Sequence, residues 1–360
     1  LALGAFLYAY GSAGTNSTYR ANQRAFQKFG IIPRMLVNAT RRSLETTIFG
    51  VTHPSPILVA PIGVQAIFAE EAELNPARAA GKLKIPFILS TAASRTIEEV
   101  AEANGPDSHR WFQLYWPRTN DVTLSLLNRA KASGYKALVV TLDTMGLGWR
   151  PHDLATAYMP FAHGVGIQVG KSDPVFMARY GKQPGVFFGR EWLKEANSGL
   201  YRDWEDLRFL RDNWEGPLVL KGIQSVHDAE KALEYGVNGI IVSNHGGRQV
   251  DGAIPSLYAL ETIMMSTKIK EAQQSGTLTI LFDSGIRTGS DIFKAIALGA
   301  QAVLIGRPWL YGSIVGGQAG VEQVLKHTLA DLDNTLGLAG YTCLREIQGK
   351  GEAVIAKLDL

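Results

Sequence analysis

The sequence predicts an α/β protein folded as a TIM (β/α)8 barrel, one domain over residues 1–360 with a long lid insertion after the fourth strand. Eight short apolar runs have the β-branched composition of strands buried in a parallel sheet. Amphipathic stretches with helix signals lie between most of these runs. A doubly wound sheet also alternates strands with helices, but eight such units favour closure into a barrel.

The predicted strands form two groups of four along the chain. The first group is PILVAPIG from residue 56, IPFILS from 85, RWFQLY from 110 and ALVVT from 137. The second group is PLVLK from 217, GIIVS from 239, LTILFD from 278 and QAVLIG from 301. The predicted helices between them include TIEEVAEA from 96, DVTLSLLNRAKASG from 121, SVHDAEKALEYG from 225 and TGSDIFKAIALG from 288.

Residues 144–216 interrupt this alternation. The segment holds aromatic residues, Gly and Pro with only scattered helical periodicity. It is too rich in Trp, Phe and Tyr for simple disorder, and connections of this length in compact domains are usually functional. We therefore expect an extended loop that covers the barrel mouth as an active-site lid.

Composition points to small-molecule partners. A chain of 360 residues with 46% hydrophobic content can bury a large core, although length alone would fit two domains equally well. The 36 basic and 33 acidic residues nearly balance, at a net charge of +3, which gives no sign of nucleic acid or an anionic membrane as partner.

Cysteine use and the N-terminal residues bear on location. Cys343 is the only cysteine, which excludes an internal disulfide and a Cys-based metal site and favours an intracellular enzyme. The apolar stretch LALGAFLYAYG is too short and too interrupted by Gly to span a bilayer. We expect a cytoplasmic protein without a metal site, although trimmed termini would hide a targeting signal.

Residues with functional groups follow every predicted strand. They are Gly63, Ser90, Gln113 with Tyr115, Thr141 with Asp143, Lys221, Ser243 with His245, Asp283, and Gly306 with Arg307. In a TIM barrel all of these positions face the same mouth. Loops are often polar by chance, but the convergence of so many different groups predicts an active site there.

The run SNHGGRQVDGAIP from residue 243 carries the strongest chemical signal. His245 has the side chain best suited to proton transfer near neutral pH, and Arg248 supplies a guanidinium that can hold a carboxylate through two hydrogen bonds. A base beside an anion-binding group predicts an acidic substrate. An isolated His and Arg at this spacing would more often be a turn residue and a solvated charge.

Two Gly- and Arg-containing segments predict a phosphate site. They are DSGIRTGSD at 283–291 and IGRPWLYG at 305–312, after the seventh and eighth strands, where Gly lets backbone N–H groups approach an anion and Arg287 and Arg307 add charge. Lys221 suits either a pyridoxal phosphate Schiff base or an anionic flavin. Gln113 and Thr141 suit the hydrogen-bonding edge of a flavin, which favours FMN.

With these residues assembled, the chain resembles the FMN-dependent L-2-hydroxy acid oxidising family, which includes glycolate oxidase, lactate oxidase and mandelate dehydrogenase. The similar segments are FQLYWP at 112, TLDTMGLGWRPHDL at 141, LKGIQ at 220, SNHGGRQ at 243, FDSGIRTGSD at 282 and IGRP at 305. Lactate 2-monooxygenase looks most similar, through RANQRAF at 20, APIGV at 60, GWRPHDL at 148 and KSDPVF at 171.

The resemblance implies a role for each matching residue. His245 would be the active-site base oriented by Asp143, Arg248 and Arg150 would bind the substrate carboxylate, and Tyr8 and Tyr115 would hydrogen-bond the substrate. The implied FMN-binding residues are Pro61, Ile62, Gly63, Ser90, Gln113, Thr141, Lys221, Ser243, Asp283, Gly285, Arg287, Gly306 and Arg307. The family also implies a homotetramer or homo-octamer, with a 2-hydroxy acid and dioxygen as small-molecule partners.

The predicted reaction is oxidation of a small L-2-hydroxy acid, L-lactate first. A 2-oxo acid retained after oxidation would be decarboxylated to acetate and carbon dioxide, as in lactate 2-monooxygenase, whereas early release would give pyruvate and hydrogen peroxide. Gly63, where many oxidases of the family carry Ala, suits the first outcome or a larger pocket. Removal of the α-hydrogen as a proton or as a hydride requires the same base. A non-catalytic flavin-binding barrel is the remote alternative.

Overall fold

Eight parallel strands close into a barrel in the computed structural model, which describes residues 1–183 and 185–359. In barrel order they are β10 (Thr279–Phe282), β11 (Ala302–Ile305), β4 (Ile57–Val59), β5 (Phe87–Ser90), β6 (Arg110–Leu114), β7 (Ala137–Thr141), β8 (Leu218–Ile223) and β9 (Gly239–Val242). Seven of them lie within a predicted run, and β8 begins within PLVLK and extends two residues beyond it, so the predicted TIM barrel is confirmed.

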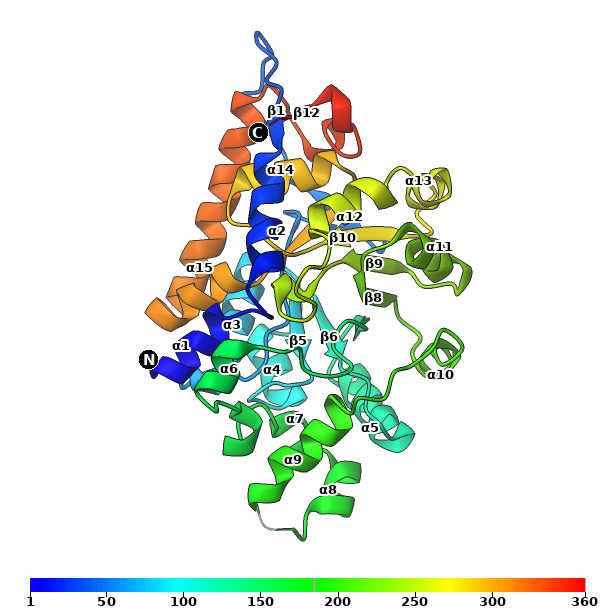
Figure 1. The fold of residues 1–360 in the computed structure, drawn as a ribbon. Coiled ribbons are helices and arrows are strands. Elements are labelled where there is room, and N and C mark those ends of the chain that lie inside the picture. The colour runs from blue at the N-terminus through cyan, green and yellow to red at the C-terminus, as the bar shows by residue number, and fades with distance from the viewer. Residues whose placement is uncertain (184, 360) are drawn as a thin grey trace.

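Helices form the outer layer around these strands (Figure 1). They are α3 (Leu74–Leu83), α4 (Ile97–Asn104), α5 (Asn120–Ala132), α10 (Leu207–Asn213), α11 (Val226–Glu234), α12 (Ser256–Ile263), α13 (Thr267–Gln274), α14 (Gly289–Ala297) and α15 (Arg307–Leu338). The four predicted helices correspond to α4, α5, α11 and α14. Capping boxes begin two of them: Thr96 with Glu99 at α4, and Thr288 with Asp291 at α14.

Strand alternation explains why functional groups gather at one end of the barrel. Side chains of the strands point alternately inward and outward, and Trp111, Val139, Val219, Ile241 and Leu281 belong to the apolar cluster inside the barrel. Two positions further along each strand direction, the inward-facing residues are Gln113, Thr141, Lys221, Ser243 and Asp283. We refer to this set as the mouth layer. It continues the inward-facing rows of the core with polar side chains.

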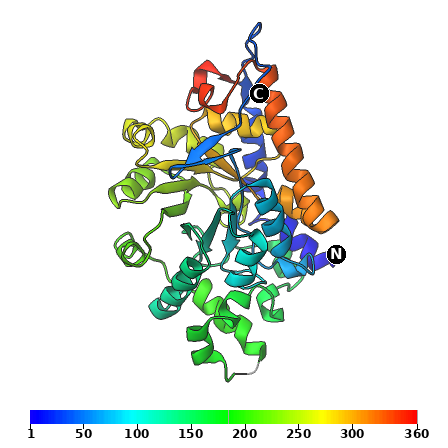
Figure 2. The same ribbon diagram turned by 180° about the vertical axis from the view of Figure 1, so that it is seen from behind.

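Short terminal elements close the opposite end of the barrel and flank its side. The hairpin of β2 (Thr46–Ile48) and β3 (Val51–His53), coloured blue in Figure 2, brings Ile48 into the same apolar cluster as the barrel interior. Strand β1 (Phe29–Ile31) pairs with β12 (Ile355–Lys357), which joins the two ends of the chain. Helix α1 (Leu3–Tyr10) lies at the mouth end of the barrel, and α2 (Ser17–Gln27) runs along the barrel from there towards β1 at the opposite end (Figure 1).

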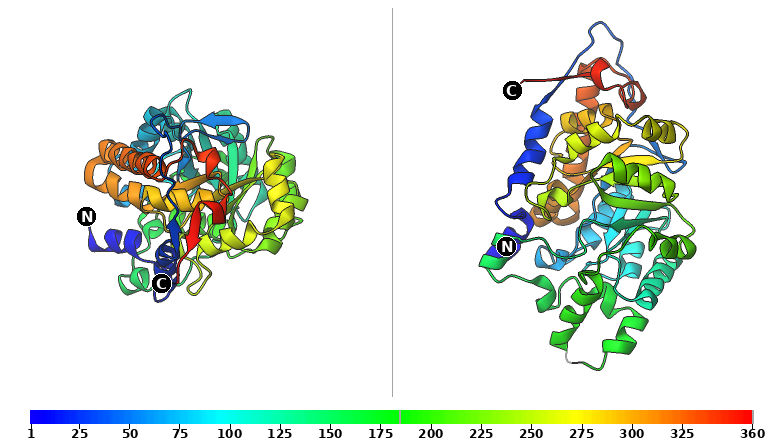
Figure 3. Two further views of the ribbon diagram at one scale, coloured as in Figure 1. Left: turned by 90° about the horizontal axis from the view of Figure 1, so that it is seen from above. Right: turned by 45° about the vertical axis from the view of Figure 1, so that its right-hand side comes forward.

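The insertion between β7 and β8 differs from the predicted extended loop because most of it is helical. It contains α6 (Pro151–Ala155), α7 (Gln168–Lys171), α8 (Pro174–Tyr180) and α9 (Gly185–Ala196), and it forms the end of the molecule opposite the C-terminus in the right-hand view of Figure 3. Pro begins α6 and α8, and the Asp173 side chain caps α8. Helices as short as α6, α7 and α8 show too little periodicity to be recognised from sequence.

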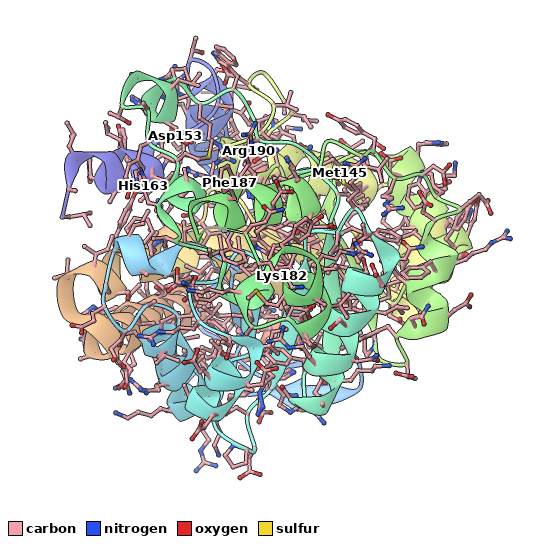
Figure 4. The ribbon with its side chains drawn as sticks, turned by 90° about the horizontal axis from the view of Figure 1, so that it is seen from below. Met145, Asp153, His163, Lys182, Phe187 and Arg190 are labelled. Carbon is pink, nitrogen blue, oxygen red and sulfur yellow. The ribbon has the colours of Figure 1, made fainter. Side chains whose placement is uncertain are left out.

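The insertion has its own small core. Trp192 on α9 is 0% exposed and packs edge-on against Phe176 of α8, with 5.2 Å between the ring centroids. Seen from below, its labelled residues Met145, His163, Lys182, Phe187 and Arg190 lie in front of the barrel (Figure 4). Within residues 1–183 and 185–359, no helix is long and apolar enough to cross a membrane.

Candidate active site

A cavity opens at the mouth of the barrel and holds about 1190 Å³ of space, its open entrance included. Small-molecule sites are concave and combine apolar walls with a few converging polar groups, and this cavity has both features. The predicted site residues that line it are Tyr8, Pro61, Ile62, Gly63, Gln113, Tyr115, Thr141, Arg150, Lys221, His245, Arg248, Asp283, Gly285, Arg287, Gly306 and Arg307.

Three predicted residues do not line this cavity and instead support those that do. The Ser90 hydroxyl accepts a hydrogen bond from the Ala92 N–H at 3.1 Å, and does not cap α4. The Ser243 hydroxyl accepts hydrogen bonds from Lys221 Nζ at 3.1 Å and from the His245 N–H at 3.0 Å. Asp143 does not reach the cavity itself, and its carboxylate contacts Nδ1 of the lining residue His245.

His245 is held by a buried carboxylate. Its Nδ1 lies 2.7 Å from Asp143 Oδ1 and 3.0 Å from Thr144 Oγ1, and no partner for Nε2 is found among the described residues. Burial lowers the pKa of His245, and the Asp143 charge offsets part of that change. The imidazole is therefore neutral near pH 7, with Nδ1 protonated towards Asp143 and Nε2 free to accept a proton.

Asp143 remains ionised despite its burial. Burial would raise the pKa of this carboxyl group, but the Lys221 charge and the hydrogen bonds from His245 and Thr144 hold it well below its usual range. Asp143 Oδ2 lies 3.5 Å from Lys221 Nζ, and Asp283 Oδ2 lies 3.6 Å from the same nitrogen. Burial alone would lower the pKa of Lys221, but these two carboxylates raise it. One ammonium group thus carries its charge between two buried anions.

Two guanidinium groups, those of Arg150 and Arg248, line the cavity together with His245. Arg248 Nη1 donates to the carbonyl groups of Tyr8 and Gly11, both at 2.7 Å, and its guanidinium stacks on the Tyr8 ring at 5.0 Å. Burial and the nearby Arg150 charge lower the pKa of Arg248 to about 9. Because two buried like charges stabilise an anion placed between them, this pair favours a carboxylate ligand.

The two tyrosines differ in their surroundings. Tyr8 comes from α1 and packs beside Tyr158 of the insertion, with 6.3 Å between the ring centroids. Tyr115 follows β6, and burial raises its pKa to about 12. The Tyr115 phenol is therefore neutral at physiological pH and available as a hydrogen-bond donor in the cavity.

The polar edge of the mouth layer is fixed by internal hydrogen bonds. Gln113 Nε2 donates to Thr141 Oγ1 at 2.9 Å, and Gln113 Oε1 accepts from the Thr91 N–H at 3.2 Å. Asp283 Oδ1 accepts from the Ser284 hydroxyl at 2.6 Å. These groups offer neutral donors and acceptors on one side of the cavity and a carboxylate on the other.

The predicted phosphate end combines cations with glycine backbone. Gly285 has φ of +100°, and a Cβ there would lie 2.9 Å from the Asn22 carbonyl oxygen, so glycine is required. Gly306 precedes α15, whose N-terminus favours anions. Arg307 also serves the protein itself, since it donates to the carbonyl groups of Ala9, Gly11 and Gly246.

These residues fit FMN. A flavin ring needs neutral hydrogen-bonding groups and a cation at its pyrimidine edge, and the cavity presents Gln113, Thr141 and Lys221 there. A ribityl chain suits Asp283, and a phosphate suits Gly285, Arg287 and the start of α15. Lys221 is the strongest support for FMN, because a buried ammonium group that lines a cavity suits a ligand that gains negative charge, as a flavin does on reduction.

Several residues that line the cavity are not among those that the sequence predicts for the site. They are Val64, Phe68, Ala92, Thr144, Leu147, Phe161 and Asn197. Thr144 adjoins Asp143 and could have been included, but Phe161 and Asn197 lie in the insertion, where no strand marks their position. Thus the residues that the insertion contributes to the cavity come from segments without a regular sequence pattern.

Gly63 does not enlarge the pocket as the sequence suggested. A Cβ built on Gly63 would lie 2.6 Å from the Ala92 carbonyl oxygen and 2.7 Å from the Ala92 Cβ. Ala92 therefore occupies the space where a methyl group would lie. The glycine permits close packing of the 62–64 loop on Ala92, which is supported by the hydrogen bond from the Val64 N–H to the Ala92 carbonyl at 2.8 Å.

Comparisons with known proteins show which family and which solved structures this chain is similar to. The family model for FMN-dependent dehydrogenase matches residues 1–353. An FMN-dependent alpha-hydroxy acid dehydrogenase of Schizosaccharomyces pombe is 47% identical, over 94% of this chain and 84% of the relative. An L-lactate oxidase of Lysinibacillus sphaericus is 40% identical, over 96% and 87%. A crystal structure of mandelate oxidase is similar with a TM-score of 0.83 and 36% identity, over 96% of this chain and 93% of that chain.

Proposed function

This chain belongs to the FMN-dependent dehydrogenase family, an oxidoreductase family with FMN as cofactor, and on that premise we propose that it oxidises a small L-2-hydroxy acid with dioxygen as acceptor. L-lactate is the proposed first substrate. The proposed outcome is that of lactate 2-monooxygenase, in which the 2-oxo acid is decarboxylated before release to give acetate, carbon dioxide and water.

One observation carries the proposal: a proton acceptor and two carboxylate-binding groups line the same cavity. His245 has Nδ1 occupied by Asp143 at 2.7 Å, and Arg150 and Arg248 line the cavity beside it. A 2-hydroxy acid has a carboxylate for the guanidinium groups and a hydroxyl proton for the imidazole on adjacent carbons. The functional groups of this substrate class therefore match the kinds of group that line the site.

In the proposed mechanism, Arg150 and Arg248 bind the substrate carboxylate and fix the orientation of the α-carbon. His245 Nε2 accepts a proton from the substrate, and the Asp143 charge stabilises the imidazolium that forms. Tyr115 donates a hydrogen bond to the substrate from its neutral phenol. FMN, when bound, supplies the acceptor for the two electrons that leave the substrate and passes them to dioxygen.

The chain's own residues also hold the cofactor in this proposal. Pro61, Ile62 and Gly63 would contact the ring, and Gln113 and Thr141 would bind its polar edge, while Ser90 accepts a hydrogen bond from Ala92 and Ser243 accepts one from Lys221. Lys221 places its charge at the same edge, where it stabilises negative charge. Asp283 binds the ribityl chain, and Gly285, Arg287, Gly306 and Arg307 bind the phosphate.

We further propose that residues 1–360 form one FMN-binding domain in which 144–216 act as the active-site lid. Support comes from Arg150, Leu147, Phe161 and Asn197, all of which belong to this segment and line the cavity. A wall that closes over the product would lengthen its residence beside peroxide, which favours decarboxylation.

Release of pyruvate and hydrogen peroxide is the second candidate outcome. Two observations favour it. Relatives at 40% and 39% identity are named L-lactate oxidase. In addition, Ala92 occupies the space left by Gly63, so the glycine gives the product no extra room.

Mixing the purified holoenzyme with L-lactate without oxygen, followed by admission of oxygen, tests the proposal. We expect the flavin absorbance to bleach, and then acetate and carbon dioxide to form with little peroxide. Bleaching followed by pyruvate and stoichiometric peroxide would establish the second outcome. If L-lactate and longer or aromatic L-2-hydroxy acids all fail to bleach the flavin, the proposed reaction is wrong.

Assembly as a homotetramer or homo-octamer is also proposed. Exposed apolar side chains support it, since Tyr201 and Val250 are 80% and 63% exposed and line one surface groove. Light scattering of the purified protein across a concentration series should give a single mass of four or eight chains, and a monomer throughout would contradict this assignment.

A further inference from the structure

The side chain of Gln249 joins the loop that carries His245 to the beginning of the insertion. Its Nε2 donates to the carbonyl groups of Asp143 and Gly146, both at 2.9 Å. Its Oε1 accepts from the Gly148 N–H at 3.1 Å and from Arg150 Nη2 at 2.7 Å. All four hydrogen-bonding positions of the amide are therefore used, and every partner lies within residues 143–150.

The chemistry of the partners fixes the orientation of this amide. Carbonyl oxygens only accept, so Nε2 must face Asp143 and Gly146, and the backbone N–H and guanidinium only donate, so Oε1 must face Gly148 and Arg150. No other side chain offers two donors and two acceptors in this planar arrangement except Asn, which is one methylene shorter. The contacts thus depend on the amide and on its reach.

Arg150 depends on the same loop for its placement. This side chain is 6% exposed, and its Nε donates to the Arg248 carbonyl at 3.0 Å while Nη2 donates to Gln249. Both hydrogen bonds that hold the guanidinium therefore come from two consecutive residues. These two contacts fix the orientation of the planar guanidinium and therefore of its remaining N–H groups.

The beginning of the insertion packs directly on this loop. A Cβ at Gly148 would lie 2.5 Å from the Arg248 carbonyl oxygen and 2.8 Å from the Gln249 Cα. Such close packing holds the backbone at Gly148 against the backbone of residues 248 and 249. Gln249 therefore sets two distances at once, since it holds the backbone of Asp143, which orients His245, and the guanidinium of Arg150.

We propose that Gln249 is a positioning residue for substrate binding: it holds Arg150 at a fixed place relative to the Asp143 and His245 pair, so that a carboxylate and the neighbouring hydroxyl are bound together. The inference rests on the proposed function, because it assigns a carboxylate to Arg150. It predicts that Gln249 acts through Arg150 and therefore matters mainly for binding of the carboxylate.

A double-mutant cycle of Gln249→Met with Arg150→Met tests this proposal. The readout is the second-order rate constant of anaerobic flavin reduction, taken from initial slopes, so saturation is not required. Since a hydrogen bond to a charged group is involved, we expect Gln249→Met to lower this constant about 10- to 100-fold in the natural chain and less than about 3-fold in Arg150→Met. Equal losses in both backgrounds would overturn the proposal.

Calorimetric titration with pyruvate provides a readout that needs no turnover. Gln249→Met should weaken pyruvate binding about 10- to 100-fold while the limiting reduction rate at saturating substrate changes less than about 3-fold. The matched control is Gln224→Met, because Gln224 Oε1 has no hydrogen-bond partner among the described residues. Unchanged pyruvate binding in Gln249→Met, or equal weakening in the control, would contradict the positioning role.

Two further outcomes have to be distinguished from a failure of the positioning role: loss of FMN or of folding in the variant, and failure of the proposed function. If Gln249→Met loses FMN or fails to fold, Gln249→Asn carries the same test, since it keeps the amide but cannot reach Arg150, and normal pyruvate binding by that variant would overturn the inference. If the natural chain is not reduced by any 2-hydroxy acid but binds pyruvate through Gln249, the proposed function fails while the positioning role stands.

Discussion

The mouth layer of the barrel and the insertion line the same cavity but are built differently. Gln113, Thr141 and Lys221 are 1%, 1% and 5% exposed and continue inward-facing rows of barrel strands. Leu147 in the insertion is 40% exposed, and Phe161 and Asn197 belong to segments held by short helices. The comparison teaches that strand geometry places the polar groups of the mouth layer, whereas the insertion adds Arg150 and the apolar side chains of Leu147 and Phe161 to the same cavity.

The largest effect should follow from removing the base at the barrel mouth. Because His245 Nε2 is the proposed proton acceptor, His245→Gln should lower the limiting rate of flavin reduction about 10²- to 10⁴-fold with FMN still bound. Anaerobic stopped-flow absorbance measures this rate. The control is His227→Gln on α11, an exposed histidine, which should leave the rate unchanged. A loss under about 10-fold in His245→Gln would assign the proton to another group.

The next effect compares two lysines for stability. Lys221→Met leaves the Asp143 and Asp283 carboxylates without their shared cation and should lower the free energy of unfolding by about 3–5 kcal/mol. Lys194→Met in the insertion breaks an ion pair to Glu191 with 53% of the lysine side chain exposed, and should cost at most about 1 kcal/mol. Urea unfolding at a fixed excess of FMN measures both. Equal losses would remove the distinction between the two regions.

Much of this distinction could be predicted from sequence. All eight strands and the residues after them were identified, because parallel strands buried on both faces give short apolar runs and their ends meet at one mouth. The insertion could not be resolved, because α6, α7 and α8 each have fewer than eight residues and their packing depends on distant contacts. That Gly63 adds no space to the cavity also could not be predicted, because this depends on the position of Ala92, which no sequence pattern indicates.

A smaller effect should change selectivity without changing the chemistry. Phe161→Ala opens the insertion side of the cavity, so the specificity constant for a longer L-2-hydroxy acid relative to L-lactate should rise about 10-fold or more. Steady-state assays with acids of increasing chain length measure this ratio. An unchanged ratio would show that the insertion does not contact the substrate side chain.

The smallest effect concerns the pH dependence of reduction. His245 must be neutral to accept a proton, and burial lowers its pKa although Asp143 offsets part of that change, so activity should persist as the pH falls below the ordinary histidine pKa. Asp143→Asn removes the anion that favours the imidazolium, and the acidic limb of the profile should therefore move to lower pH. A shift to higher pH would mean that Asp143 does not act on His245.

The most direct test of the division between barrel and insertion is anaerobic stopped-flow reduction of the natural chain and Phe161→Ala by a series of L-2-hydroxy acids. We predict bleaching in both proteins, with altered dissociation constants across the series but limiting rates within about 10-fold of each other for any one acid. If no acid bleaches the bound flavin, or if Phe161→Ala loses rate as severely as His245→Gln, the account is contradicted.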